Sequence, residues 1–362
     1  MSKALKILND LSLIAEPAFK EFKTTEYIVD FLKKENIKID KIFKTGCFGT
    51  IDIGKEKTIA IRADIDALPI NKNSTEFKHL CGHHAHTAGL LLALKTINEN
   101  REKLKHNIRY IFQPAEETGN GAQFIIDQGA MRNISYVFGL HGDPNYPLGN
   151  VCLKKGEVMA GAASFDIKIN GKSTHAAFPQ YGNDVVVAMS EYINICQKII
   201  SRFKDPMENG LISFTMVNCG SAKNILPEKV EISGTFRFFN NHIKSLIKDK
   251  MIDSLKAIEK IYNVKGEISF DFVTEPVKNS SELIDKLKKF LEKDYKIIND
   301  YNKIMGSEDF SEYLKIAKGV FLIVGIATSN NHPPLHNKDF FVTEKAVEIY
   351  RDIWEKLAFN FK

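Results

Sequence analysis

The stretch of sequence that decides the fold is residues 58–69, which read TIAIRADIDALP. Its first half is a mostly apolar run of strand length, and such runs suit strands that are covered on both faces of a sheet. Its end carries Asp64 and Asp66, whose spacing of two residues puts both carboxylates on one side of the strand end. We therefore predict a buried strand ending in acids that could orient a ligand or hold a metal, or could simply be solvated.

On either side of this stretch, runs of strand type alternate with runs of helix type. Strands are predicted at residues 50–53, 107–112, 136–141 and 319–327, and helices at residues 2–15, 23–35, 121–131, 280–295 and 344–359. This alternation favours an α/β fold with a central mixed sheet flanked by helices. Functional sites in such sheets gather at the carboxyl ends of the strands.

The pattern changes from about residue 157. A strand at 164–170, a helix at 184–203, strands at 211–217 and 229–239, a helix at 242–262 and a strand at 267–273 follow one another. This β-α-β-β-α-β order is the ferredoxin-like, split-βαβ arrangement. We therefore predict an α/β domain formed by residues 1–156 and 274–362, with an inserted α+β satellite domain at residues 157–273.

Metal-capable side chains follow several of the predicted strands. Residues 79–86 read HLCGHHAH, and thiolate and imidazole are good ligands for zinc and its neighbours in the first transition series. Glu116 and Glu117 follow the strand at 107–112; because adjacent side chains point different ways, one could ligate a metal while the other faces a metal-bound water. His141 ends another strand. Each group has an alternative interpretation. Residues 79–86 could be a helix start that happens to be rich in histidine, Glu116 and Glu117 could be surface acids, and His141 could be a core histidine.

The composition suits a soluble globular protein of two domains. The chain has 362 residues, of which 44% are hydrophobic and 26% charged, and a net charge of +5. The lysines are spread along helix faces, which argues against a nucleic-acid patch. Five cysteines without a close pair favour a reducing compartment. With neither a signal peptide nor an apolar run long enough to span a bilayer, the sequence predicts a cytoplasmic protein.

Eight short motifs occur in register along nearly the whole chain. They are RADIDALP at residues 62–69, CGH at 81–83, QPAEE at 113–117, GLH at 139–141, GKSTHAA at 171–177, NILP at 224–227, GSEDF at 306–310 and LHN at 335–337. Together they resemble the M20 metallopeptidase and amidohydrolase family, specifically its amidohydrolase branch. That branch includes hippurate hydrolase-like, N-acetyl-diaminopimelate deacetylase-like and auxin-conjugate hydrolase-like enzymes.

The resemblance implies roles for particular residues of this chain. Two divalent metal ions would lie at the site, and zinc, manganese, cobalt and nickel all remain open. Glu116 would be the general base, and His175 would stabilise the oxyanion, reaching the site across a subunit interface in dimeric relatives. Asn224 and Arg237 would hold a substrate carboxylate. The expected metal ligands are Cys81, His83, Glu117, His141 and His336, with the Cys81 thiolate between the metals.

The resemblance therefore predicts an amide hydrolase that removes the acyl group from N-acyl amino acids, of N-acetyl or N-benzoyl type, by means of metal-activated water. The expected partner is a small molecule, with no nucleic acid and no membrane, and the inserted domain could serve as a lid or as a homodimer interface. A dipeptidase or aminopeptidase with the same metals is the alternative. A catalytically silent small-molecule binder is the alternative from another class.

Two segments depart from the pattern of the family. Relatives usually have aspartate after the CGH motif, whereas this chain has His84, which could donate a hydrogen bond, add a ligand or change the metal preference. Relatives often carry an Arg-Arg-x-Leu/Phe-His segment before a Pro-Glu-Leu/Ile-Gly stretch. This chain has NDLSLI at residues 9–14 and EPAF at residues 16–19, so the shape of the substrate pocket is expected to differ.

Overall fold

The structure is a computed structural model that describes residues 1–71 and 73–362, and it divides into two compact units. Unit 1 comprises Met1–Val158, Val277–Lys303 and Glu308–Lys362, and unit 2 comprises Met159–Pro276 and Ile304–Ser307. The predicted satellite domain at residues 157–273 covers most of unit 2. The short segment Ile304–Ser307, which the sequence analysis assigned to the first domain, groups with unit 2 instead.

Unit 1 is built on a large mixed sheet with the strand order β1-β2-β6-β3-β7-β18-β8-β17. Strands β6, β3, β7 and β18 run parallel to their neighbours within that set, whereas β2 is antiparallel to β6 and β8 is antiparallel to β18. The strand bounds are β1 (Lys41–Ile42), β2 (Cys47–Ile51), β3 (Thr58–Asp64), β6 (Asn107–Gln113), β7 (Ile134–Pro147), β8 (Asn150–Cys152), β17 (Lys296–Ile298) and β18 (Lys318–Ala327). The prediction of an α/β fold is confirmed.

Strand β3 lies inside this sheet, between β6 and β7, and every one of its residues is buried. Its bounds agree with those of the predicted strand. A strand that is covered on both faces is mostly apolar along its length, so the apolar run marks where the strand begins and ends. The same burial encloses Arg62 and Asp64, which are 1% and 0% exposed. Buried charges of this kind require partners.

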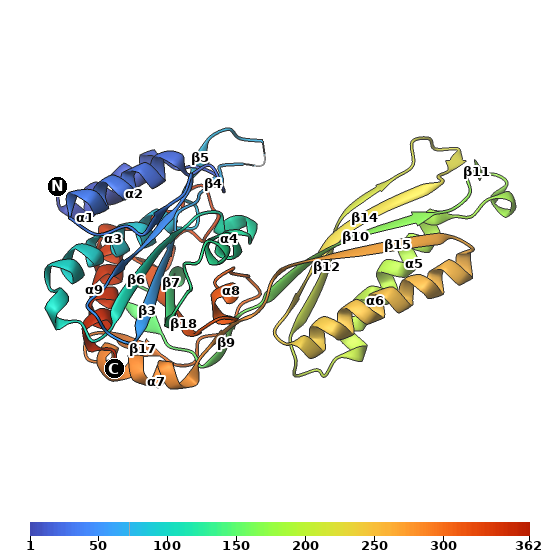
Figure 1. Cartoon of the computed structure of the whole chain (residues 1–362). Coiled ribbons are helices and arrows are strands. Elements are labelled where there is room, and N and C mark those ends of the chain that lie inside the picture. The colour runs from blue at the N-terminus through green and yellow to red at the C-terminus, as the bar shows by residue number, and fades with distance from the viewer. Residues whose placement is uncertain (72) are drawn as a thin grey trace. The chain divides into compact units, whose positions relative to one another are not determined.

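Helices cover both faces of the large sheet (Figure 1). One layer contains α1, α2, α3, α7 and α9, whose apolar faces form a continuous core with the sheet, and α4 and α8 lie on the other face. The helix bounds are α1 (Lys3–Leu13), α2 (Phe22–Lys34), α3 (His83–Glu99), α4 (Gly121–Asp127), α7 (Ser281–Leu291), α8 (Ser311–Leu314) and α9 (Glu344–Asn360), with short 3-10 turns at η1 (Arg101–Lys103) and η2 (Glu116–Thr118).

Unit 2 contains a smaller antiparallel sheet with the strand order β12-β14-β10-β15. Figure 1 shows α5 and α6 on one face of this sheet, and their apolar residues form a separate core with it. The predicted split-βαβ arrangement is confirmed. The bounds are β10 (Gly161–Asn170), α5 (Val185–Lys198), β12 (Gly210–Cys219), β14 (Lys229–Phe238), α6 (Asn241–Tyr262) and β15 (Lys265–Thr274), with the 3-10 turn η3 (Pro179–Tyr181) and the π-helical turn η4 (Ile199–Phe203).

Short strand pairs complete the fold. They are β4 (Leu68–Pro69) with β5 (Phe77–Lys78), β9 (Gly156–Met159) with β16 (Val277–Asn279), and β11 (Thr174–His175) with β13 (Ile225–Leu226). Among the described residues, none of the helices combines the length and the apolar character needed to cross a bilayer.

Candidate metal and catalytic site

The beginning of α3 places Cys81 and His83 beside each other. Gly82 between them has a φ of +91°, a left-handed conformation that glycine adopts without strain, and the chain turns there into the helix. His141 comes from β7, in the centre of the sheet, and its Nε2 lies 3.3 Å from the Cys81 Sγ. A helix start and a strand therefore converge on one point of unit 1.

The turn η2, which follows β6, supplies Glu116 and Glu117. The Glu117 Oε1 lies 3.9 Å from the His83 Nε2 and 3.9 Å from the His336 Nε2. The Glu116 Oε2 lies 3.9 Å from the same His83 Nε2. His336 itself lies in the loop after β18, where its backbone N–H donates to the Leu80 carbonyl at 2.8 Å and so ties this loop to the Cys81 segment.

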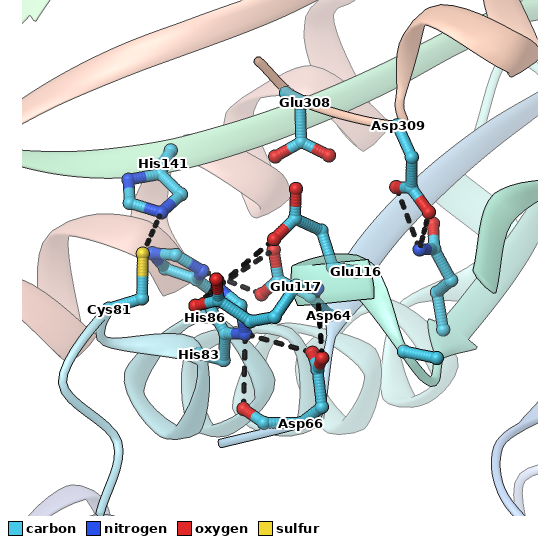
Figure 2. Close-up of polar contacts among 12 residues, drawn as sticks. Asp64, Asp66, Cys81, His83, His86, Glu116, Glu117, His141, Glu308 and Asp309 are labelled. Atoms are coloured by element: carbon cyan, nitrogen blue, oxygen red, sulfur yellow. Dashed lines mark hydrogen bonds and ion pairs between the residues drawn. The ribbon is translucent and has the colours of Figure 1, made fainter. Parts of the chain in front are cut away.

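The structure brings together the five residues that the family resemblance implies as ligands. Figure 2 shows Cys81, His83, Glu117 and His141 of this set. In each of several sets, donor atoms lie within 4.8 Å of one another: Cys81 with His83 and His141, Cys81 with Glu117 and His336, and His83 with Glu116 and Glu117. Cys81 is common to the first two of these sets. A sulfur in that position is suited to lie between two cations.

Hydrogen bonds orient the two buried imidazoles of the cluster. The His83 Nδ1 lies 3.1 Å from both the backbone oxygen and the Oδ1 of Asp66, and the His141 Nδ1 lies 2.8 Å from the Gly142 carbonyl. When each Nδ1 carries the proton that these oxygens accept, each Nε2 is left with a free lone pair directed into the cluster. A histidine that binds a metal through one ring nitrogen typically donates the other ring N–H to a carboxylate or carbonyl oxygen in this way.

Two buried atoms of the cluster have no hydrogen-bond partner among the described residues, the His83 Nε2 and the Glu117 Oε1. Buried polar atoms are normally satisfied, so unpartnered ones facing each other across 3.9 Å need an explanation. Both are good ligand atoms for zinc and related ions. The donor set therefore fits a bound cation.

Burial and mutual repulsion shape the charges of the site. Burial, together with the carboxylates of Glu308 and Glu117, holds the pKa of Glu116 well above its usual range. Burial also raises the pKa of Glu117 to about 7. Burial, and the Glu117 carboxylate beside it, raise the pKa of the Cys81 thiol. Positive charge favours the ionised forms of these groups. The Asp64 carboxylate helps to raise the pKa of the nearby His83 well above its usual value, which favours a positive charge on that ring, and bound cations would act on these groups in the same direction.

Arg62 is the centre of a buried network next to this cluster. Its guanidinium donates to Gln113 at 2.8 Å and to Asp64 at 2.7 Å. It also donates to Glu308 at 2.9 Å and to Asp309 at 3.0 Å. In Figure 2 the Glu308 carboxylate points toward that of Glu116. Arg62 offsets only part of the negative charge in this region, which again favours cations.

His84, the departure from the family pattern, belongs to none of these donor sets. Its ring stacks on that of His79, with 4.7 Å between the centroids and 18° between the planes. Burial lowers the pKa of His84 well below its usual value and that of His79 to about 3, so both rings are neutral. His84 therefore packs beside the cluster, and the acid that contacts the His83 ring is Asp66.

The predicted residues of unit 2 are described within that unit. His175 is exposed on β11, and the Ala176 N–H donates to the Asn224 carbonyl at 2.9 Å, so the β11–β13 pair brings the His175 and Asn224 segments together. Arg237 lies on β14, where its Nη1 donates to the Thr235 hydroxyl at 2.5 Å. Their roles toward substrate stay predictions.

The sequence singled out Asp64 and Asp66 as acids that could orient a ligand, and in the structure both contact site residues; His86 and Arg62 were not assigned from the sequence. Asp66 positions both His83 and the Glu117 amide, which donates to its Oδ2 at 3.0 Å. His86 is held by Asp64 at 2.7 Å and accepts from the Gly142 N–H at 3.2 Å. One signal was available: Arg62 is a charged residue inside an otherwise apolar strand, and such a residue must have partners when buried.

A cluster of a thiol, imidazoles and carboxylates of this kind is found in metal-dependent hydrolases. Residues 60–360 match the sequence profile described as Peptidase family M20/M25/M40. The chain belongs to this family.

Individual relatives are similar over most of their length. An N-acetyl-L-cysteine deacetylase of Bacillus subtilis is 34% identical over 91% of this chain and 80% of its own. Thermostable carboxypeptidase 2 of Saccharolobus solfataricus is 32% identical over 96% of this chain and 92% of its own. The crystal structure of a Bacillus subtilis protein described as a dinuclear metal-binding M20 peptidase has a TM-score of 0.86 at 28% identity, covering 99% of this chain and 97% of the other.

Proposed function

We infer that the protein is a metal-dependent hydrolase that removes the acyl group from N-acyl amino acids. The observation that carries this inference is the convergence of Cys81, His83, Glu117, His141 and His336, with Glu116 at the edge of the same cluster. Family membership and the similarity to an N-acetyl-L-cysteine deacetylase support the acyl amino acid as the class of substrate.

We propose that these five residues hold two divalent cations, with Cys81 between them. The donor atoms fit such ions, and the similar Bacillus subtilis structure is described as dinuclear. Thiolate and imidazole suit zinc, cobalt or nickel, and a site that includes a carboxylate also admits manganese. When bound, the cations would lower the pKa of a water molecule at the site from about 15.7 to about 7.

Glu116 is the residue proposed to move the proton. Its carboxylate adjoins the cluster without completing either of the sets that share Cys81. Burial raises its pKa above the usual value, which favours the uptake of a proton from the attacking water. It would accept a proton from the attacking water and deliver it to the leaving nitrogen. Asp66 and Asp64 would keep the neighbouring imidazoles in place during this transfer.

We propose further that His175, Asn224 and Arg237 serve the substrate. The family motifs support an oxyanion-stabilising role for His175, and the matching positions in the inserted domain support a carboxylate-binding role for Asn224 and Arg237. Arg237 is suited to this role because a guanidinium can bind both oxygens of a carboxylate at once. Alanine at Arg237 is expected to raise KM for N-acyl amino acids more than it lowers kcat.

The substrate class can be tested with the purified protein after each metal is restored in turn. N-acetyl and N-benzoyl amino acids are expected to be hydrolysed faster than dipeptides with a free amino group, as measured by the release of free amino acid. The similarity to a carboxypeptidase keeps peptide hydrolysis as the second candidate, and preference for dipeptides would establish it. Binding without turnover across the panel would indicate a silent binder.

We also propose a homodimer formed through unit 2. Strand β12 lies at an edge of its sheet and exposes Leu211, Met216 and Val217, and α5 exposes Val186 and Val187. Exposed apolar groups on an edge strand favour pairing with another chain. Light scattering is expected to give a dimer for the wild type and a monomer for Met216→Lys. Ile261→Lys, at an exposed site on α6, is the matched control and should remain dimeric.

A further inference from the structure

The turn that carries Glu116 and Glu117 is held in an unfavourable backbone conformation. Ala115, the residue before them, has φ and ψ of 54° and 40°, in the left-handed region, although it is not a glycine. Such residues persist only where the surrounding structure holds them firmly, and they concentrate at functional sites. What holds Ala115 therefore sets the direction of both carboxylates.

The carbonyl side of Ala115 is held from within the turn. The Gly121 N–H and the Thr118 hydroxyl both donate to the Ala115 oxygen, at 3.2 Å each. The N–H side has a partner from far away in the sequence: it donates to the Oε1 of Glu21 at 2.8 Å. Glu21 immediately precedes α2 and is 0% exposed.

Glu21 is itself fixed in place. Its backbone oxygen accepts hydrogen bonds from both the N–H and the hydroxyl of Thr25, and the Thr25 hydroxyl also accepts from the Gly46 N–H at 2.7 Å. Five residues earlier, the Glu16 carbonyl accepts from the Ala67 N–H at 2.8 Å, next to Asp66. The segment Glu16–Glu21 thus contacts two of the chain segments that bring acids to the site, those of Asp66 and of Glu116.

We propose that Glu21 is a positioning residue for the catalytic turn, which it holds through Ala115. The proposal rests on the proposed function, because it assigns Glu116 and Glu117 their roles. Glu21 comes just after the unusual EPAF segment at residues 16–19, whose first residue, Glu16, contacts Ala67. The second oxygen of Glu21 has no hydrogen-bond partner among the described residues, so the function requires one acceptor and not a charge.

Three variants test the proposal. Glu21→Met fills a similar space without an acceptor and is expected to lower kcat and the affinity for the restored metal by about 10–100-fold, the usual effect of losing a contact behind the ligands. Glu21→Gln keeps an oxygen for Ala115 and is expected to remain close to wild type. Asn107→Leu is the matched control: Asn107 accepts from the Ile53 and Lys55 amides at the opposite end of β6 and should alter stability alone.

Metal affinity is measured by competition with a chelator, kcat and KM by steady-state kinetics, and stability by thermal unfolding. The proposal is overturned if Glu21→Met keeps the kcat and metal affinity of the wild type. It is also overturned if Glu21→Met and Asn107→Leu lose the same amount of stability and show the same changes in kcat and metal affinity. If Glu21→Met does not fold, Glu21→Ala replaces it. If that variant also fails to fold while Glu21→Gln folds, the hydrogen bond serves folding and the proposal is wrong.

The same series separates this proposal from the proposed function. A wild-type protein that binds metal but hydrolyses no substrate of the panel contradicts the function. Weaker metal binding by Glu21→Met, with normal binding by Glu21→Gln, would still support the positioning role in that case. Normal hydrolysis by the wild type and by Glu21→Met contradicts the positioning role alone.

Discussion

Replacing Glu116 with glutamine is expected to abolish turnover while the protein keeps its metal. The amide has the shape of the carboxyl group but cannot accept the proton that the attacking water must lose. General acid–base catalysis of this kind contributes about 10²–10⁴-fold, so kcat should fall by at least about 10²-fold. Elemental analysis of the same sample should find the wild-type metal content.

The structure makes the retention of metal a specific expectation. Glu116 forms one set with Glu308 and Asp309 and another with His83 and Glu117, but it belongs to neither of the sets that contain Cys81. Because Glu308 and burial already disfavour the charged form of Glu116, a neutral side chain is tolerated there, and the variant should unfold at no lower temperature than the wild type.

Two further variants make the result interpretable. Glu117→Gln should lose both metal and activity, since the Glu117 Oε1 faces His83 and His336. Glu312→Gln, on α8 and paired with Lys315, is a control that should change neither. Near-normal kcat in Glu116→Gln would show that another group is the base. Loss of metal from that variant would make Glu116 a ligand.

The parts of the fold that the sequence predicts are those with strong local signals. The bounds of β3 follow from a continuous apolar run and those of α6 from apolar residues at helical spacing. The split-βαβ order follows from the succession of such segments. The short strands β8 and β17 were not predicted. Each has three residues and is stabilised by its place at one side of the large sheet, a tertiary effect that has no local signature.

The residues of the site likewise fall into those with a local sequence signal and those positioned by distant contacts. Cys81 and His83 can be identified because ligands two residues apart in a turn have a recognisable spacing. The role of Arg62 could not be predicted, because its partners Glu308 and Asp309 lie 246 and 247 residues away. The left-handed Ala115 was equally hidden, since alanine has no preference for that conformation and only its contacts, including Glu21, hold it there.

Removal of the metal is expected to abolish activity, and its return is expected to release protons. The Cys81 thiol has a raised pKa and keeps its proton near neutral pH, as does part of the Glu117 population at its pKa of about 7. Metal ligands must be deprotonated, so cations displace these protons. Metal affinity should consequently rise with pH and weaken as the pH falls toward 5.

The release can be measured by calorimetry in buffers of different ionisation enthalpy, and at least about one proton per chain is expected at pH 7. Cys81→Ser should release fewer protons and bind metal more weakly, because a hydroxyl does not ionise in this range. Cys152→Ser alters a buried thiol outside the ligand sets and should behave like wild type.

At a free metal concentration of about 100 times Kd, bound metal should add about 2.7 kcal/mol to the free energy of unfolding. A stripped protein with full activity, or one whose unfolding temperature ignores metal, would be incompatible with cations held by Cys81, Glu117 and the three histidines.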